Sequence, residues 1–357
     1  MKSFGLWYKE MPPANKTKDD SKFALHVNFW SLEDIETDEN IGEPYLDIGI
    51  KITNYESVEK MTFFCPFNLD KNCIQDLSEK FSKKNNANII FNDDCEIETK
   101  DNFTIIKMSN REKLLIFPLF RVIKNICKVE TIEDSDGTKI IFNFQEFHKY
   151  VAEVSKLKNI KKIYIRFRIK DITLRDYIYF DSEPLNKSFE SAFSGTRIID
   201  FKVNEKRDIN DSVRTETIVD KQNWADFDSI HFLAMMPSSY GVTSFCKEQM
   251  TCRELEDGLW DDYLGTGIRF EKGHVLAYHW RKKQEKDEGI TDFSCLLKID
   301  YSKTKVMTIF SYALSVVALG MIGSILVEFL PKCEFKGCSF IIAAILLISA
   351  IVIGKRK

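Results

Sequence analysis

The chain has 357 residues, of which 44% are hydrophobic and 29% charged, and its formal net charge is -3 at pH 7. With 28 Phe but only 15 Gly and 8 Pro, this composition excludes a disordered chain and predicts a buried core in one large domain or two ordinary ones. The sequence has no Walker loop and no G-x-G-x-x-G, G-x-S-x-G or H-E-x-x-H motif. It therefore indicates neither an enzyme nor a cofactor.

Strand patterns dominate the first part of the chain, after a polar N-terminal arm. Residues 23–30, 45–52 and 61–67 each have the composition of a strand, and the second alternates apolar and polar positions. An amphipathic helix is predicted near 73–83, and short strands should then form a meander up to residue 143. The spacing of Phe144, Phe147 and Val151 predicts one more helix. Residues 1–157 should therefore form a β-rich N-terminal domain.

The sharpest polar pattern follows in KKIYIRFRIKD, where apolar and basic residues alternate. A strand here would carry an apolar face and a basic one, and the next segment, if also a strand, would add more groups to the basic face. Basic and aromatic side chains together bind phosphates and stack on bases. The alternative is a solvated face paired with carboxylates. The predicted ligand-binding residues are Lys162, Tyr164, Arg166, Arg168, Lys170, Arg175 and Tyr177.

Other candidate sites are weaker. A helix predicted over residues 244–263 ends in Asp257, Asp261 and Asp262, which could hold a divalent cation but are also typical of a solvated helix face. The five histidines are scattered, and His274 and His279 should point to opposite faces of a strand. We therefore predict no metal site. This second, α+β domain should span residues 158–303.

The C-terminal segment, residues 304–357, contains two apolar runs, 306–330 and 338–354, joined by a short connection. The first run is long enough to cross a bilayer, and the two predict a transmembrane helical hairpin; the alternative is a pair of core helices. Basic residues flank both ends and no signal peptide precedes the large domain, so both termini should be cytoplasmic. The predicted fold class is α+β, with antiparallel sheets that could form a sandwich, followed by this hairpin. The predicted location is the inner membrane, as a multi-pass protein.

The hairpin could line a pore after oligomerisation, or it could serve only as an anchor. Small, weakly polar residues and one carboxylate favour a pore. The candidate pore-lining residues are Ser311, Ser315, Gly320, Ser324 and Glu328. Cys333 and Cys338, at the turn of the hairpin, could form a disulfide.

A cytosolic sensor domain joined to two membrane helices resembles the membrane effectors of bacterial anti-phage defence systems. The resemblance covers architecture only. It implies a membrane-anchored sensor whose homo-oligomer gates a pore in the lipid bilayer when a ligand binds, without catalysis. The ligand would be a nucleotide or oligonucleotide, supplied by a nucleotide-synthesising partner protein. The alternative is a membrane-anchored scaffold that recruits a protein partner.

Overall fold

The structure is a computed structural model that describes residues 2–12, 20–32, 44–100, 102–120, 126–132, 137–157, 159–171, 173–182, 194–256, 258–265, 274–285, 288–302, 316–317, 319–320 and 323–324. The chain divides into two compact units. The first contains Met1–Phe180, Ile198–Ser238 and Thr243–Leu297, and the second contains Asp181–Arg197, Ser239–Val242 and Lys298–Lys357. Residues on both sides of the boundary expected at 157 thus belong to the first unit. The predicted three-domain division stays a prediction.

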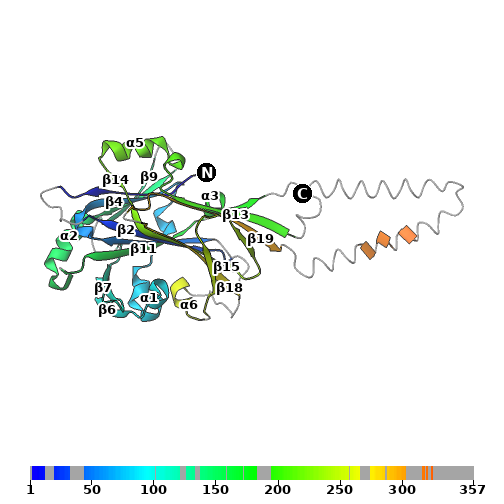
Figure 1. The fold of residues 1–357 in the computed structure, drawn as a ribbon, viewed down its shortest axis with the longest axis horizontal. Helices are drawn as coiled ribbons and strands as arrows, with labels where there is room; N and C mark the ends of the chain where they lie inside the picture. Colours follow the sequence, from blue (N-terminus) through cyan, green and yellow to red (C-terminus); the bar gives the residue numbers. More distant parts are fainter. Residues whose placement is uncertain are drawn as a thin grey trace. The chain divides into compact units, whose positions relative to one another are not determined.

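Strands are the main secondary structure of the described chain and form three sheets (Figure 1). The first has the order β14 (Asn223–Trp224), β1 (Gly5–Glu10), β4 (Val58–Cys65), β10 (Thr138–Asn143) and β9 (Cys127–Thr131). The second has the order β17 (Met250–Glu254), β18 (Val275–Lys283), β15 (Phe227–Pro237), β2 (Lys22–Trp30), β3 (Tyr45–Thr53), β11 (Lys162–Lys170), β8 (Lys113–Ile116), β7 (Phe103–Lys107) and β6 (Glu96–Lys100), with β5 (Ile74–Asp76) paired to β11. The third has the order β12 (Tyr179–Ser182), β13 (Ser194–Val203), β19 (Phe293–Ser302) and β16 (Gly241–Ser244).

The five-stranded and ten-stranded sheets face each other across an aromatic core. The ring of Phe63 on β4 lies 5.6 Å from that of Phe167 on β11, and the ring of Tyr8 on β1 lies 4.8 Å from that of Phe23 on β2. The apolar residues of β11 all point into this core, as their alternation in the sequence predicts. The strands predicted at 23–30, 45–52 and 61–67 are confirmed as β2, β3 and β4.

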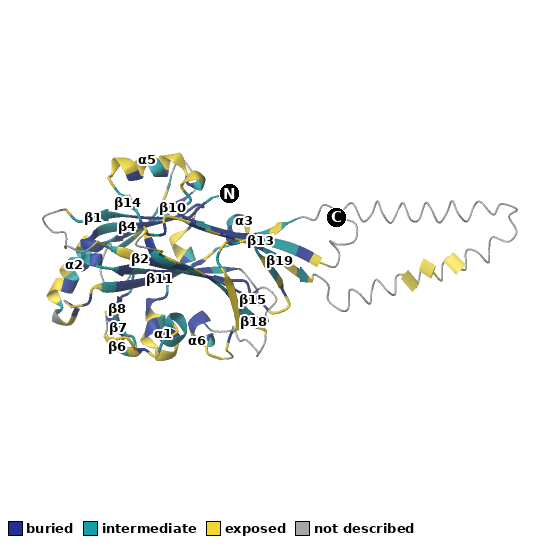
Figure 2. Ribbon diagram, in the orientation of Figure 1, coloured by how far each residue is buried: buried dark blue, intermediate teal, exposed yellow. Residues whose placement is uncertain are grey.

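The helices are short. They are α1 (Lys84–Phe91), α2 (Phe144–Glu153), α3 (Leu174–Tyr177), α5 (Asp211–Val219) and α6 (Asp261–Leu264), with 3-10 turns η1 (Tyr55–Ser57), η2 (Lys71–Cys73), η3 (Ser78–Ser82), η4 (Ser155–Leu157) and η5 (Lys206–Asp208). Helix α2 confirms the helix predicted from the spacing of Phe144, Phe147 and Val151, whose side chains are all buried. Asn143 caps this helix by accepting a hydrogen bond from the Gln145 amide. Figure 2 shows the buried residues concentrated in the sheets and the exposed ones on α2 and α5.

Two predicted helices are wrong. Residues 73–83 instead form η2, β5 and η3, because this segment binds the edge of β11: the Leu77 amide donates to the Arg166 carbonyl at 3.1 Å. Residues 244–263 contain β17 and the four-residue α6 instead of one long helix. All five residues of β17 are exposed, so the sequence contains no alternation that could reveal a strand.

The predicted fold class must also be corrected. No helix in the described part of the chain is long and apolar enough to cross a membrane. The longest, α2, has ten residues and spans about 15 Å, roughly half of the ~30 Å hydrocarbon core. Most of the predicted hairpin, 304–357, lies outside the described residues. The expectations of a transmembrane hairpin, a channel or pore-forming protein and a multi-pass inner-membrane location are withdrawn on this finding.

Candidate functional site

The second face of the ten-stranded sheet, opposite the aromatic core, holds the basic residues of β11. The two central ones, Arg166 and Arg168, are not solvated, because α1 and α6 lie on this side of the sheet (Figure 1). Arg166 is 1% exposed and Arg168 is 2% exposed. Buried guanidinium groups need partners, since an unpaired charge in the interior is costly. The partners of these two arginines differ, and the difference decides what each can do.

Arg168 is bound to a buried carboxylate. Its Nε and Nη2 atoms donate to the two oxygens of Asp47 at 2.6 and 3.0 Å, a bidentate pair. Trp30 and Tyr263 donate to the same carboxylate at 3.0 and 2.7 Å. Burial alone would raise the pKa of Asp47, but the charge and hydrogen bonds of Arg168 outweigh burial and hold that pKa below its usual value. Arg168 therefore holds this side of the sheet together and is not available to a ligand.

Arg166 has no bidentate carboxylate. Its Nε atom donates to the hydroxyl of Tyr263 at 2.6 Å and its Nη1 atom to that of Tyr164 at 2.7 Å, while Nη2 lies 4.0 Å from Asp47 Oδ2. Gly49, beside them, leaves them room: a Cβ atom at that position would lie 2.1 Å from the Tyr164 hydroxyl. Arg166 thus presents a guanidinium that is held by neutral hydroxyls and lines a cavity.

This cavity, which we call the histidine cavity, has a volume of about 610 Å³. That size falls within the range of small-molecule binding sites. Its lining includes four cationic side chains and three histidines among other polar residues, and no carboxylate lines it among the described residues. These seven side chains are Lys51, Arg166, Arg253, Arg281, His26, His231 and His279.

Strand register places these groups in a row. Arg281 on β18 lies opposite His231 on β15, which lies opposite His26 on β2. His26 in turn lies opposite Gly49 on β3, and Gly49 opposite Arg166 on β11. Paired residues of neighbouring strands project from the same face, so one cross-strand row carries two arginines and two histidines.

The three histidines contact one another. His231 Nδ1 and His279 Nε2 are 3.1 Å apart, and the rings of His26 and His231 have centroids 5.1 Å apart. Burial, followed by electrostatic repulsion from the neighbouring His279 when it is protonated and from cations such as Arg281, lowers the pKa of His231 to about 4. Burial also lowers the pKa values of His26 and His279, and nearby cations lower them further. At neutral pH the three rings are uncharged and act as hydrogen-bonding groups.

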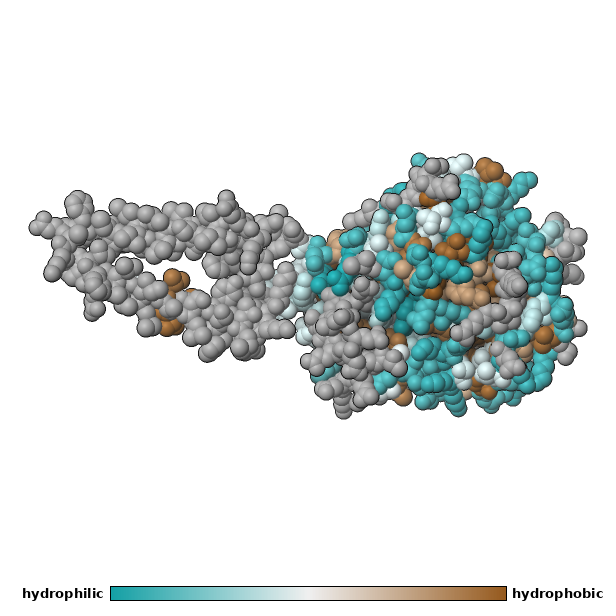
Figure 3. Space-filling model, turned by 180° about the vertical axis from the view of Figure 1, so that it is seen from behind, coloured by the Kyte–Doolittle hydropathy of each residue, from teal (hydrophilic) through white to brown (hydrophobic). Residues whose placement is uncertain are grey.

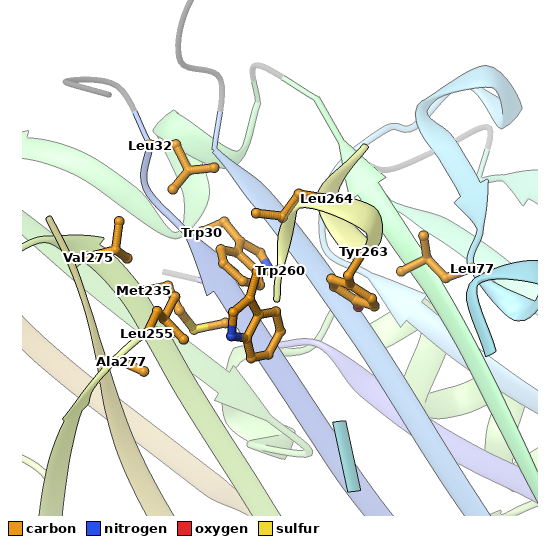
Figure 4. Packing of buried hydrophobic residues seen from close by; sticks show 10 residues of the cluster. All are labelled: Trp30, Leu32, Leu77, Met235, Leu255, Trp260, Tyr263, Leu264, Val275 and Ala277. Atoms are coloured by element: carbon orange, nitrogen blue, oxygen red, sulfur yellow. The ribbon is translucent and has the colours of Figure 1, made fainter. Parts of the chain in front are cut away.

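One side of the cavity is apolar. Phe91 and its neighbours on α1 line it, together with Trp260. Trp260 packs edge-on against Trp30, with ring centroids 5.3 Å apart, within a buried cluster beside the cavity (Figure 4). A ligand would therefore meet charges and histidines on one side and rings and aliphatic groups on the other.

Among the predicted ligand-binding residues, Arg166 lines the histidine cavity, and the hydroxyl of Tyr164 accepts a hydrogen bond from Arg166. Lys162 forms an ion pair with Glu112 at 3.2 Å. Lys170 lies over the ring of Tyr45, at the other end of β11.

Arg175 and Tyr177 lie on the short helix α3, not on a strand beside β11, and β12 pairs with β13. The structure therefore does not bring these two residues together with the basic face of β11. The predicted pairing failed because the apolar positions of this segment fit a single helical turn as well as a strand.

The histidines were missed as a group. Each lies on a strand whose alternation is visible in the sequence: in FALHVNFW, for example, His26 occupies the same face as Ala24 and Asn28. What the sequence does not show is which strands are neighbours, and β2 and β15 are far apart in the chain.

The remaining candidates form no site among the described residues. Ser311, Ser315, Glu328, Cys333, Cys338 and Asp257 lie outside that part of the chain. Gly320 and Ser324 are exposed helical residues, and Ser324 donates a hydrogen bond to the Gly320 carbonyl. Asp262 pairs with Lys83 at 2.7 Å. In the part of the chain that the structure describes, no group of three or more His, Cys, Asp or Glu side chains could hold a metal ion.

No protein-family model and no curated protein matches this chain. The chemistry of the histidine cavity must therefore be inferred from its own geometry.

Proposed function

We propose that this protein binds a small anionic ligand of the nucleotide class in the histidine cavity. The observation that carries the proposal is the composition of the described lining: four cations and three histidines, no carboxylate, and an apolar side with two aromatic rings. Such a lining favours anions, because an anion gains charge-assisted hydrogen bonds there and meets no like charge.

The cations differ in how far they are already neutralised. Lys51 lies 3.5 Å from Glu112, and Arg253 lies 3.7 Å from Glu256. Arg281 has no ion pair with a carboxylate among the described residues, and Arg166 is held mainly by hydroxyls. These two arginines lie at opposite ends of the cross-strand row, and a phosphate near either one would supply negative charge where the protein's own carboxylates supply little.

The apolar side favours a nucleotide over a bare inorganic anion. Phosphate or sulfate would leave most of a cavity of about 610 Å³ unfilled. An aromatic base can pack on rings such as those of Phe91 and Trp260, and stacking of this kind contributes about 1–3 kcal/mol per base. The same reasoning allows a short oligonucleotide that places one of its nucleotides in the histidine cavity.

In this proposal the protein binds the nucleotide without catalysing a reaction and so acts as a sensor. A partner protein that synthesises the nucleotide would supply the ligand, and a homo-oligomer could report its binding. The pore expected from the sequence is not part of the proposal, because it depended on the membrane hairpin.

The test is calorimetric titration of the full chain with ATP, GTP, di- and trinucleotides, adenosine and inorganic phosphate. We expect at least one nucleotide to bind in the micromolar range, and adenosine and phosphate to bind much more weakly. Arg281→Gln and Lys51→Gln should each weaken that binding about tenfold or more, since each removes a charged hydrogen-bond donor.

The matched control is Arg207→Gln, which removes an exposed arginine paired with Glu205 outside the cavity. It should leave the affinity within twofold. If no nucleotide binds more tightly than inorganic phosphate, or if Arg207→Gln weakens binding as much as Arg281→Gln, the cavity is not a nucleotide site.

A further inference from the structure

Two cysteines of the first unit lie side by side, away from the histidine cavity. Cys295 is a buried residue of β19, and Cys246 is a half-buried residue just beyond the end of β16. They are adjacent because β16 and β19 are neighbours in the third sheet. All seven cysteines in the described part of the chain are free thiols.

Backbone pairing sets their alignment. The Phe245 amide donates to the Leu296 carbonyl at 2.9 Å. Continuing this antiparallel alignment by one residue places Cys246 directly opposite Cys295. In an antiparallel pair, residues next to a hydrogen-bonded pair form a non-hydrogen-bonded pair with Cα atoms about 4.5 Å apart, within the range that a disulfide spans.

The side chains agree with the backbone. Cys246 Sγ lies 3.8 Å from the carbonyl oxygen of Leu296, the residue that follows Cys295. Opposite residues of paired strands project from the same face, so both sulfurs lie on one side of the sheet.

The two thiols are unequal. The neighbouring Cys295 thiol stabilises the Cys246 thiolate by more than burial destabilises it, and the pKa of Cys246 is lowered to about 7. Burial and the neighbouring sulfur raise the pKa of Cys295. At neutral pH Cys246 is therefore about half thiolate, partly accessible, and in contact with a protonated thiol, the arrangement of an attacking cysteine and a resolving cysteine.

We propose that Cys246 and Cys295 form an oxidisable dithiol, with Cys246 as the residue that reacts with a hydroperoxide. The Cys246 thiolate attacks the terminal peroxide oxygen, the O–O bond breaks, and after protonation of the leaving oxygen an alcohol or water departs, leaving a sulfenic acid on Cys246. The Cys295 sulfur then attacks the Cys246 sulfur, an S–S bond forms, and the Cys295 proton leaves with the hydroxide as water. The dithiol loses two electrons and the hydroperoxide gains them.

Cys252 serves as the internal comparison. It is exposed on β17, six residues along the chain, and burial of its sulfur raises its pKa. If exposure alone decided reactivity, Cys252 would react before the half-buried Cys246. If thiolate content decides, the order is reversed.

The first measurement is the rate of alkylation of the reduced full chain by iodoacetamide at pH 7.5, followed by peptide mass spectrometry. We expect Cys246 to be labelled about tenfold faster than Cys252, in proportion to thiolate content. Equal rates, or faster labelling of Cys252, would overturn the assignment of Cys246 as the reacting thiol.

The second measurement is peptide mapping without reductant after treatment with hydrogen peroxide. We expect a linked pair of peptides that contain Cys246 and Cys295, and its disappearance after reduction. Cys295→Ser should leave a trappable sulfenic acid on Cys246, whereas Cys252→Ser should leave the linked pair unchanged. Should Cys295→Ser fail to fold, the wild-type map still decides: a Cys246 that stays unlinked while other thiols oxidise rules the dithiol out.

Discussion

The two faces of strand β11 differ in how they are held. On one face, Ile163, Ile165, Phe167 and Ile169 pack into the core between the two larger sheets. On the other face, Arg166 and Arg168 are equally buried, but they depend on named hydrogen-bond partners. Apolar packing is spread over many weak contacts and tolerates small changes, whereas a buried polar network fails when one member is removed.

The largest effect should come from breaking the polar network at its centre. Replacing Asp47 by Ala leaves Arg168 buried without its carboxylate, and Trp30 and Tyr263 without their acceptor. We expect Asp47→Ala to lower the free energy of unfolding by about 3–5 kcal/mol, as in other broken buried pairs. Urea denaturation of the two proteins measures this difference.

The control for that experiment is the double variant Asp47→Leu with Arg168→Met. It removes both charges, so the unpaired cation is absent and most of the lost stability should return. A double variant as unstable as Asp47→Ala would show that packing at Asp47, and not charge pairing, stabilises this face.

Lowering the pH should destabilise the polar face of β11 and leave the stability of its apolar face unchanged. The folded-state pKa of His231 is about 4, below the ordinary value of 6.5, so the unfolded chain takes up a proton before the folded one does. The stability that the neutral ring provides is complete above about pH 6.5 and is lost as the pH falls toward 4. The free energy of unfolding of the wild type should fall between pH 7.5 and pH 4.5. In His231→Gln we expect this fall to be smaller by about 1–3 kcal/mol.

The matched control is His274→Gln, which changes an exposed histidine just before β18. It should leave the pH dependence of unfolding close to that of the wild type. If His231→Gln and His274→Gln shift the curve equally, the cavity histidine is not kept neutral by its surroundings.

The smallest effect should come from the apolar face. Ile165 is 2% exposed, and Ile165→Val removes one methylene group from the core without leaving a polar atom unpaired. We expect a loss of about 0.5–1.5 kcal/mol and unchanged nucleotide affinity. A loss as large as that of Asp47→Ala would erase the proposed difference between the two faces.

The two faces also differ in what the sequence could predict. Period-two alternation predicted β3 and β11, because successive side chains of a strand point to opposite faces and only one face of each of these strands joins the apolar core. It predicted that Arg166 and Arg168 share a face. It could not predict that Asp47 would neutralise one of them, because that depends on the register between β3 and β11.

The histidine cavity was predictable only in part. Arg166 was identified, but His26, His231 and His279 each appear as isolated residues until strand neighbours are known. Helix α1 was missed because its sequence, KNNANIIF, is rich in Asn, and it places Phe91 against the cavity all the same. Helices of this length are formed by tertiary packing more than by local propensity.

On the face of the molecule shown in Figure 3, hydrophilic residues cover most of the surface of the described residues, with apolar residues showing between them. The histidine cavity draws on both kinds of polar residue, because Arg166 is buried in the ten-stranded sheet whereas Arg253 and Arg281 are exposed.

The parallel pairing of β2 with β15 also sets an order of assembly. Phe23 is aligned with Phe227, so two strands that supply histidines to one cavity leave the ribosome some two hundred residues apart. Until β15 emerges, β2 lacks this neighbouring strand and His26 lacks the ring of His231. Contacts this distant in sequence slow folding, so we expect a nascent chain that ends before β15 to bind chaperones and to lack the cavity altogether.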